Sequence, residues 1–120
     1  MGFEVMELAD GVMSVRITGE LKKAEADQIQ AQAIEAIRQW GKLRLLFTLE
    51  DFRGWERGVD WGDTSFALEY GDAVQKMAIV GDESWRDLVY AFLGKGLRST
   101  LIEYFSVEER GRAQAWLEED

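Results

Sequence analysis

Apolar and polar residues alternate in two short stretches near the start of the chain. Residues 3–8 and residues 12–18 both follow a period of two, which is typical of a strand with one buried face. Asp10 and Gly11 lie between them, and this pair favours a tight turn because glycine accepts a positive φ angle. We therefore predict a β-hairpin here.

The stretch from Leu21 to Trp40 changes to the period of an amphipathic helix. Its apolar residues recur every three or four positions and should form one buried stripe. Gly41 follows the last of them and suits the left-handed conformation found after many helices. The stripe consists of Ala26, Ile29, Ala33, Ile37 and Trp40.

Three later stretches also have helical periodicity. We expect helices from about Val59 to Tyr70, with Asp60 and Asp63 in the first turn, from about Trp85 to Leu93, and after Ser106. Ser106 and Glu109 have the spacing of a capping box. The residues expected to be buried are Phe66, Ala67 and Tyr70, then Trp85, Leu88, Val89, Phe92 and Leu93, and finally Ala113, Trp116 and Leu117.

Short apolar stretches separate these helices. Residues 43–49 and 76–81 are almost continuously apolar, which is typical of strands covered on both faces, and residues 100–105 form a last strand. Strands that alternate with helices predict a mostly parallel sheet, to which the hairpin adds one antiparallel pair. We predict an α/β fold in one domain over residues 1–120, a five-stranded mixed sheet covered by four helices, in the order β-β-α-β-α-β-α-β-α.

Composition removes several kinds of chemistry. The 120 residues include no cysteine, no histidine and no proline. Thiol and imidazole catalysis, disulfides and Cys/His zinc or haem sites are therefore excluded. The serines have no histidine to activate them, and no lysine stands out in the sequence as buried. We expect no catalytic residue, no metal and no cofactor.

The charge of the chain bears on its partners. Asp and Glu number 23 against 14 Lys and Arg, a net charge of −9, so phosphate backbones would be repelled on average. The few basic clusters, Lys22–Lys23 and the sparse pair Lys95 and Arg98, do not have a nucleic-acid signature. We find neither a secretory signal nor an apolar run of about 20 residues that could span a membrane, and expect a cytoplasmic protein.

Three segments resemble the SpoIIAA-like proteins of bacteria. They are residues 76–85 (KMAIVGDESW), residues 49–55 (LEDFRGW), and the ending formed by residues 103–106 (EYFS) and 113–117 (AQAWL). The resemblance extends over essentially the whole chain in element order. It implies a fold shared with STAS domains, which include anti-sigma factor antagonists, and with lipid-binding CRAL-TRIO domains.

One departure from the STAS pattern matters. STAS antagonists carry a phosphorylated serine at the start of the helix after the third strand, whereas residues 50–55 here contain no serine or threonine. The nearest hydroxyl groups belong to Thr64 and Ser65, about one turn into the expected helix, where a phosphate would lose the backbone donors of the helix start. We therefore do not transfer the phosphorylation switch to this chain.

The segment after the third strand is the most informative for function. Aromatic residues stand here beside glycines at the carboxyl end of a strand, where open α/β sheets bind ligands. Two interpretations are open: a mobile aromatic lid over an apolar pocket, or rings that seal the core or a dimer contact. Candidate ligand- or partner-binding residues are Asp51, Phe52, Trp55, Trp61, Thr64, Ser65 and Phe66.

Two other patterns have simpler explanations. The carboxylates Glu50, Asp51, Asp60 and Asp63 do not have the spacing of a calcium loop, and helix capping and solvation explain the last two. Residues 94–96 (GKG) follow a helix and lack the rest of a phosphate-loop motif, so we interpret them as a helix stop.

These observations favour a non-enzymatic module that binds a protein partner or an apolar ligand. The alternative is a carrier or sensor of a lipid or small hydrophobic molecule, by analogy with CRAL-TRIO domains; an enzyme using carboxylates near Asp51 is a third reading. A cavity of several hundred cubic ångströms beneath Trp55 and Trp61 would favour the carrier, and a flat apolar patch a protein partner. Buried carboxylates with raised pKa values would favour the enzyme. Five tryptophans in so short a chain also make a homodimer worth testing.

Overall fold

Five strands form one mixed sheet in the spatial order β1-β2-β3-β4-β5. A computed structural model of the protein describes residues 2–63 and 65–119. β1 pairs with β2 antiparallel, and every other neighbouring pair is parallel, as the sequence predicted. The strands are β1 (Phe3–Ala9), β2 (Val12–Thr18), β3 (Leu43–Glu50), β4 (Val74–Val80) and β5 (Leu101–Phe105).

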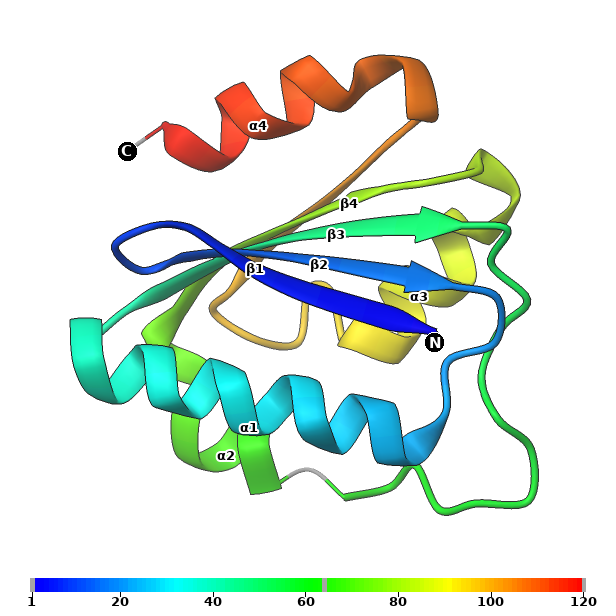
Figure 1. Cartoon of the computed structure of the whole chain (residues 1–120), viewed down its shortest axis with the longest axis horizontal. Helices are drawn as coiled ribbons and strands as arrows, with labels where there is room; N and C mark the ends of the chain where they lie inside the picture. Colours follow the sequence, from blue (N-terminus) through cyan, green and yellow to red (C-terminus); the bar gives the residue numbers. More distant parts are fainter. Residues whose placement is uncertain (1, 64, 120) are drawn as a thin grey trace.

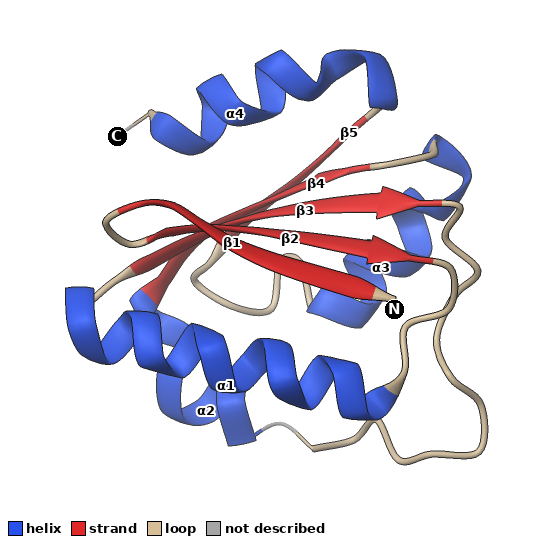
Figure 2. Cartoon of the chain, in the orientation of Figure 1, coloured by secondary structure: helices blue, strands red, loops and turns tan. Residues whose placement is uncertain are grey.

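Helices cover both faces of this sheet (Figure 1). α1 (Lys23–Trp40), α2 (Ser65–Tyr70) and α3 (Arg86–Leu93) lie on one face, and α4 (Arg110–Glu118) lies on the other (Figure 2). Each of the first three connects two neighbouring parallel strands, and right-handed crossovers in one direction place such helices on the same face. Three short 3₁₀ turns, η1 (Gly71–Ala73), η2 (Glu83–Trp85) and η3 (Val107–Glu109), complete the described elements.

Strand register explains why the core has two parts. Val15, Phe47, Ile79 and Tyr104 lie side by side across four strands, on the face that α1 and α3 cover. The opposite face contributes a smaller cluster, in which Leu46 and Ala78 of the sheet pack with α4. The almost continuous apolar sequence of β3 and β4 thus reflects burial on both sides, as predicted. Among α4 residues, Ala113 and Leu117 are buried, and Trp116 is partly buried.

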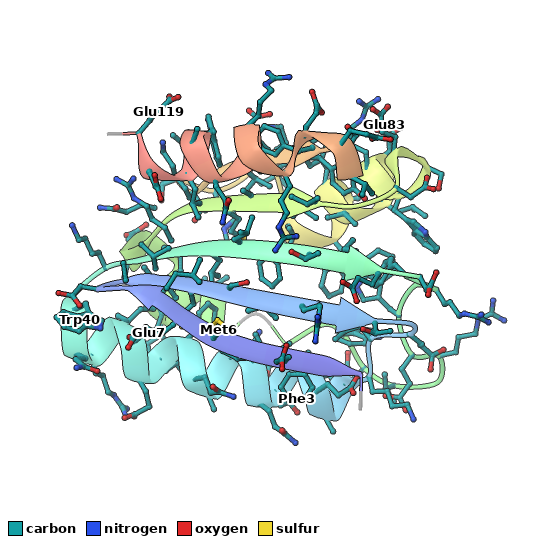
Figure 3. The ribbon with its side chains drawn as sticks, turned by 45° about the horizontal axis from the view of Figure 1, so that its top comes forward. Phe3, Met6, Glu7, Trp40, Glu83 and Glu119 are labelled. Atoms are coloured by element: carbon teal, nitrogen blue, oxygen red, sulfur yellow. The ribbon has the colours of Figure 1, made fainter. Side chains whose placement is uncertain are left out.

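Local signals at three chain turns act as the sequence indicated. Gly11 in the hairpin and Gly41 after α1 both have a positive φ, of 76° and 77°. The indole Nε1 of Trp40 donates to Glu7 Oε2 (3.1 Å), which joins the end of α1 to β1 (Figure 3). At η3, the backbone N–H of Ser106 donates to the Glu109 carboxylate (3.0 Å), the contact expected of the capping box.

The second helix is shorter than the sequence predicted. α2 begins at Ser65, and residues 59–63 form a loop instead of its first turns. Asp60 Oδ1 accepts from the backbone N–H of Gly62 (2.7 Å), and this local turn replaces the helical bond we expected. Asp63 keeps a capping contact, because its Oδ1 accepts from Ser65 N (2.9 Å).

The third helix buries less than its periodicity predicted. Trp85 lies in η2 and is partly buried; Val89 is buried, but Leu88 and Phe92 are 56% and 43% exposed. An eight-residue helix offers the sheet only about two turns, so the stripe cannot dock over its full width. Gly94 ends the helix with φ of 74°, which confirms residues 94–96 as a helix stop.

One lysine is buried, contrary to the sequence interpretation. Lys76 of β4 is 7% exposed, and its Nζ donates to the backbone oxygens of Trp116 and Glu119 (both 2.7 Å). It thereby neutralises the negative end of α4, and its role is structural. Within the described residues, no helix is long and apolar enough to cross a membrane.

Candidate ligand-binding site

The segment that follows β3 is held in place by backbone hydrogen bonds. Leu21 N donates to Gly54 O (2.9 Å), and Glu56 N donates to Leu21 O (2.9 Å), so Leu21 and Trp55 form a parallel bridge. Arg53 N donates to Gly19 O (3.0 Å). The first half of the aromatic segment therefore extends the sheet alongside the β2–α1 connection.

Five aromatic rings meet at this edge of the sheet. Phe52 contacts Trp55 and Trp85 edge to face, with ring centroids 5.3 and 4.8 Å apart. Phe92 of α3 then joins Trp55 (4.9 Å) to Trp61 (5.4 Å). Such pairs add about 0.5–1.5 kcal/mol each beyond area burial, so the cluster fixes the segment against α3.

A cavity of about 640 Å³ lies between this cluster, the sheet and the three helices on the same face. Trp55 and Trp61 line it, and α1 contributes Ile29 and Ala33. The sheet lines it with Ile17, Leu45, Phe47, Leu49, Met77 and Ile79. Apolar atoms make up most of the wall.

Short and loosely packed elements bound the cavity on the solvent side. α2 contains no fully buried residue, and its Leu68 is 84% exposed although it lines the cavity. Leu97, in the connection after α3, also lines the cavity and is 90% exposed. These two leucines mark an apolar rim where the cavity meets solvent.

Polar side chains also line the cavity. Lys23 and Asp27 of α1 form an ion pair with each other, and this hydrogen bond raises the pKa of Lys23. Asp63 accepts from the backbone N–H of Ser65, which lowers the pKa of its carboxyl. Arg98 follows α3, and burial lowers the pKa of its guanidinium.

The residues proposed from the sequence divide between the cavity and the surface. Phe52, Trp55, Trp61 and Phe66 all line the cavity, although they come from different parts of the loop and α2. Asp51 is exposed, with a positive φ of 48° that an aspartate tolerates, and Ser65 is exposed at the start of α2. Thr64 lies outside the described residues.

Other cavity residues were missed by sequence reasoning. Phe92 was assigned to a core stripe, but it is 43% exposed and lines the cavity. Leu68, Leu97 and Arg98 are isolated in the sequence, and no motif identified them as neighbours. Their contribution comes from two chain turns that bring the ends of α2 and α3 together.

The acidic residues of the loop do not converge. Asp60 and Asp63 each bind a backbone N–H two residues ahead, and Glu50 lies 3.9 Å from Arg16 on β2. Across residues 2–63 and 65–119, no group of three acidic side chains is placed to hold a metal ion.

Solved structures with the same fold place the chain among known proteins. An uncharacterised protein of the DUF3478 family from Shewanella loihica PV-4, with a SpoIIAA-like fold, has a TM-score of 0.73 over 97% of this chain and 94% of that one. The anti-sigma factor antagonist SpoIIAA, unphosphorylated, has a TM-score of 0.60 over 96% and 98%, and the phosphorylated Bacillus cell fate determinant SpoIIAA has 0.55 over 96% and 99%. Each is 16% identical, so the likeness concerns the fold.

Sequence comparison defines the family. No protein among the curated sequences matches the chain. The SpoIIAA-like family, however, matches residues 12–118, which include β2, all four helices and the cavity. The chain belongs to the SpoIIAA-like family.

Proposed function

We propose that this protein is a non-enzymatic cytoplasmic module that binds a small hydrophobic molecule in the cavity beneath Trp55 and Trp61. The observation that carries the proposal is the cavity itself, about 640 Å³ with largely apolar walls. Sites for small organic ligands span about 300–1,000 Å³ and have walls of this kind. The hypothesis of a carrier for a hydrophobic molecule is therefore favoured over that of a flat protein-docking surface.

Packing energetics support a ligand at this place. Protein interiors are close-packed, and apolar side chains around an open space forgo contacts with neighbouring atoms. A ligand that covers this wall gains about 25 cal/mol for each Å² of apolar surface removed from water. Ile29, Met77 and Val89 of this wall are held in the packed core, so the fold supplies a preformed site.

The carboxylates support the non-enzymatic part of the proposal. A general acid needs a raised pKa, whereas the pKa values of Asp63 and Asp82 are lowered by backbone N–H donors. Both side chains are exposed. Their arrangement suits turns better than proton transfer.

The experiment is a titration of the intact protein with dodecanol, below its aqueous solubility limit, followed by tryptophan emission and calorimetry. Binding should change the emission of Trp55 and Trp61, so the double variant W55F/W61F should lose most of the signal. W116F is the matched control, because Trp116 packs on the opposite face of the sheet and should leave the signal intact. Absence of both heat and emission change in the wild type would refute the proposal.

The apolar rim favours a second candidate function, contact with another protein chain. Leu68 and Leu97 are 84% and 90% exposed beside the cavity, and a second copy of the chain could cover them. Light scattering should then report a dimer for the wild type and a monomer for L97E. A wild-type monomer at high protein concentration would exclude this homodimer.

A further inference from the structure

One wall of the cavity contains an incompletely paired cation. Arg98 lies in the connection between α3 and β5, and its Nη1 donates to the backbone oxygen of Leu93 (3.2 Å). Its Nε and Nη2 are buried and have no hydrogen-bond partner among the described residues. No described carboxylate forms an ion pair with it.

The two unpaired nitrogens form one edge of the guanidinium. Nε and Nη2 carry parallel N–H groups, and this edge binds the two oxygens of a carboxylate simultaneously. Nη1 is already held by the end of α3, so the edge is fixed in orientation before any ligand arrives. Gly71 and Gly94 lie beside the side chain: a Cβ at Gly71 would lie 3.8 Å from Nη2, and one at Gly94 3.9 Å from Cδ.

Burial makes this pairing energetically important. A buried donor without a partner costs about 1–3 kcal/mol, and more when the group is charged. Asp72, the carboxylate bonded to the neighbouring Ser99, accepts from the hydroxyl of Ser99 (3.1 Å) and forms no ion pair with Arg98. Lys23 and Asp27, which also line the cavity, are paired with each other. An anionic group in the cavity would therefore find Arg98 as its partner.

We infer that the ligand of this cavity is an amphiphile with a carboxylate head, such as a fatty acid, and that Arg98 binds the head while the apolar wall holds the tail. This inference rests on the proposed function, because it assigns the ligand class of the same cavity. A net charge of −9 disfavours anions over most of the surface. Recognition of the head group thus depends on the contact with Arg98, and substitution of this residue can test it.

The test compares three ligands with the same tail in the intact protein: dodecanoate, dodecanol and dodecyltrimethylammonium. Calorimetry is done below the critical micelle concentrations of the two ions and below the solubility limit of dodecanol. It should give dodecanoate an affinity about tenfold above that of dodecanol, with the cation weakest. R98M keeps a long apolar side chain, should lower dodecanoate affinity about tenfold, and should leave dodecanol affinity within about twofold. R112M is the control, since Arg112 of α4 pairs with Glu109 of η3, and the substitution should change neither affinity.

The possible outcomes distinguish failure of the carboxylate inference from failure of the proposed function on which it rests. If no ligand binds, the proposed function fails. If dodecanol binds as tightly as dodecanoate to the wild type, or if R98M keeps the preference, the cavity remains a site and the anionic inference is overturned. If R98M does not fold, the wild-type comparison still decides, and R98K, which keeps the charge but not the paired edge, should retain only part of the preference.

Discussion

Gly81 follows β4 at a position where neighbouring side chains leave no space for a Cβ atom. A Cβ there would lie 2.7 Å from Tyr104 Oη and 3.1 Å from Leu49 Cβ. Gly111, within α4, has nothing within 4 Å of the corresponding position. Close neighbours therefore require a glycine at position 81, whereas nothing around Gly111 requires one.

Alanine substitutions should separate these two cases. We expect G81A to lower the free energy of unfolding by about 1–3 kcal/mol, because Tyr104 or Leu49 must shift. G111A should raise it by about 0.5–1 kcal/mol, since alanine favours a helix interior. Urea denaturation measures the free energy of unfolding of both variants. An unchanged stability of G81A would show that Tyr104 and Leu49 can shift without cost.

Tyr104 makes stability depend on pH at the alkaline end. Burial, with smaller contributions from the charges of Asp82 and Glu83, raises the pKa of Tyr104 from 10.0 to about 12. The folded protein thus holds the phenol proton more tightly than the unfolded chain does. This contribution is complete below pH 10 and is lost as the pH rises from 10 to about 12.

The Y104F variant isolates that contribution. Between pH 10 and 12, the unfolding free energy of the wild type should fall more steeply than that of Y104F. The variant also loses the hydrogen bond from Tyr104 Oη to Asp82 O (2.7 Å), so it should start from a lower stability at neutral pH. Urea titrations at several pH values measure both slopes, and equal slopes would contradict the assignment.

At the scale of elements, α4 is attached to the sheet by cations as well as by its apolar face. Lys76 Nζ reaches two backbone oxygens at the end of α4 and lies 4.7 Å from the centre of the Trp116 ring. Arg44 Nη1 donates to the backbone oxygens of Leu117 (2.6 Å) and Glu119 (2.8 Å). The terminal carbonyls of α4 therefore find donors in the sheet.

Removing the lysine should weaken this attachment. We expect K76M to lower the free energy of unfolding by about 1.5 kcal/mol, the contribution of hydrogen bonds to a charged donor, because methionine offers the freed carbonyls no donor. K42M is the control, because Lys42 is exposed. The comparison is made by urea denaturation, and a K76M variant as stable as K42M would refute the anchoring role.

Elements specified by local signals could be predicted from the sequence. The hairpin at Gly11, the end of α1 at Gly41 and the capping box at Ser106 each depend on neighbours within four residues. The helix expected from Val59 was wrong in its first half. There Asp60 forms a local turn with Gly62, Trp61 donates from Nε1 to Glu56 O (2.9 Å), and the Trp61 ring packs on Phe92, which is distant in the sequence. Lys76 did not stand out as a buried lysine in the sequence, because its partners lie 40 and 43 positions away.

The candidate site was predictable to a similar extent. Phe52, Trp55, Trp61 and Phe66 could be proposed because they follow the carboxyl end of a strand, a position that the fold class defines. Arg98 could not, because a lone arginine between a helix and a strand is usually solvated. Its importance depends on the turn after α3, which directs it into the cavity beside Leu93.

At the scale of the whole molecule, the two faces of the sheet are packed to different degrees. α4 closes one face with a small cluster, whereas α2 and α3, of six and eight residues, leave the cavity open on the other. A ligand bound there would link these short helices to α1 and the sheet. Ligand at 100 times its dissociation constant would add about 2.7 kcal/mol to the unfolding free energy.

Filling the cavity from the protein side should have two effects of opposite sign. Ala33 of α1 lines the cavity and is buried, so A33L places three additional carbons in the space a ligand would occupy. We expect the stability of the unliganded protein to rise by about 1 kcal/mol, because added apolar burial exceeds the packing strain. Dodecanol affinity should fall about tenfold, because ligand and side chain compete for one volume.

The control for this prediction is A115L, which makes the same change on the exposed side of α4. A115L should change neither the stability of the unliganded protein nor its dodecanol affinity. Thermal unfolding with and without dodecanol therefore distinguishes the two variants directly. A destabilised A33L that still binds dodecanol as the wild type does would mean that the ligand lies elsewhere. A rise in stability joined to a loss of affinity is a combination that general damage to the fold cannot produce, because damage lowers both.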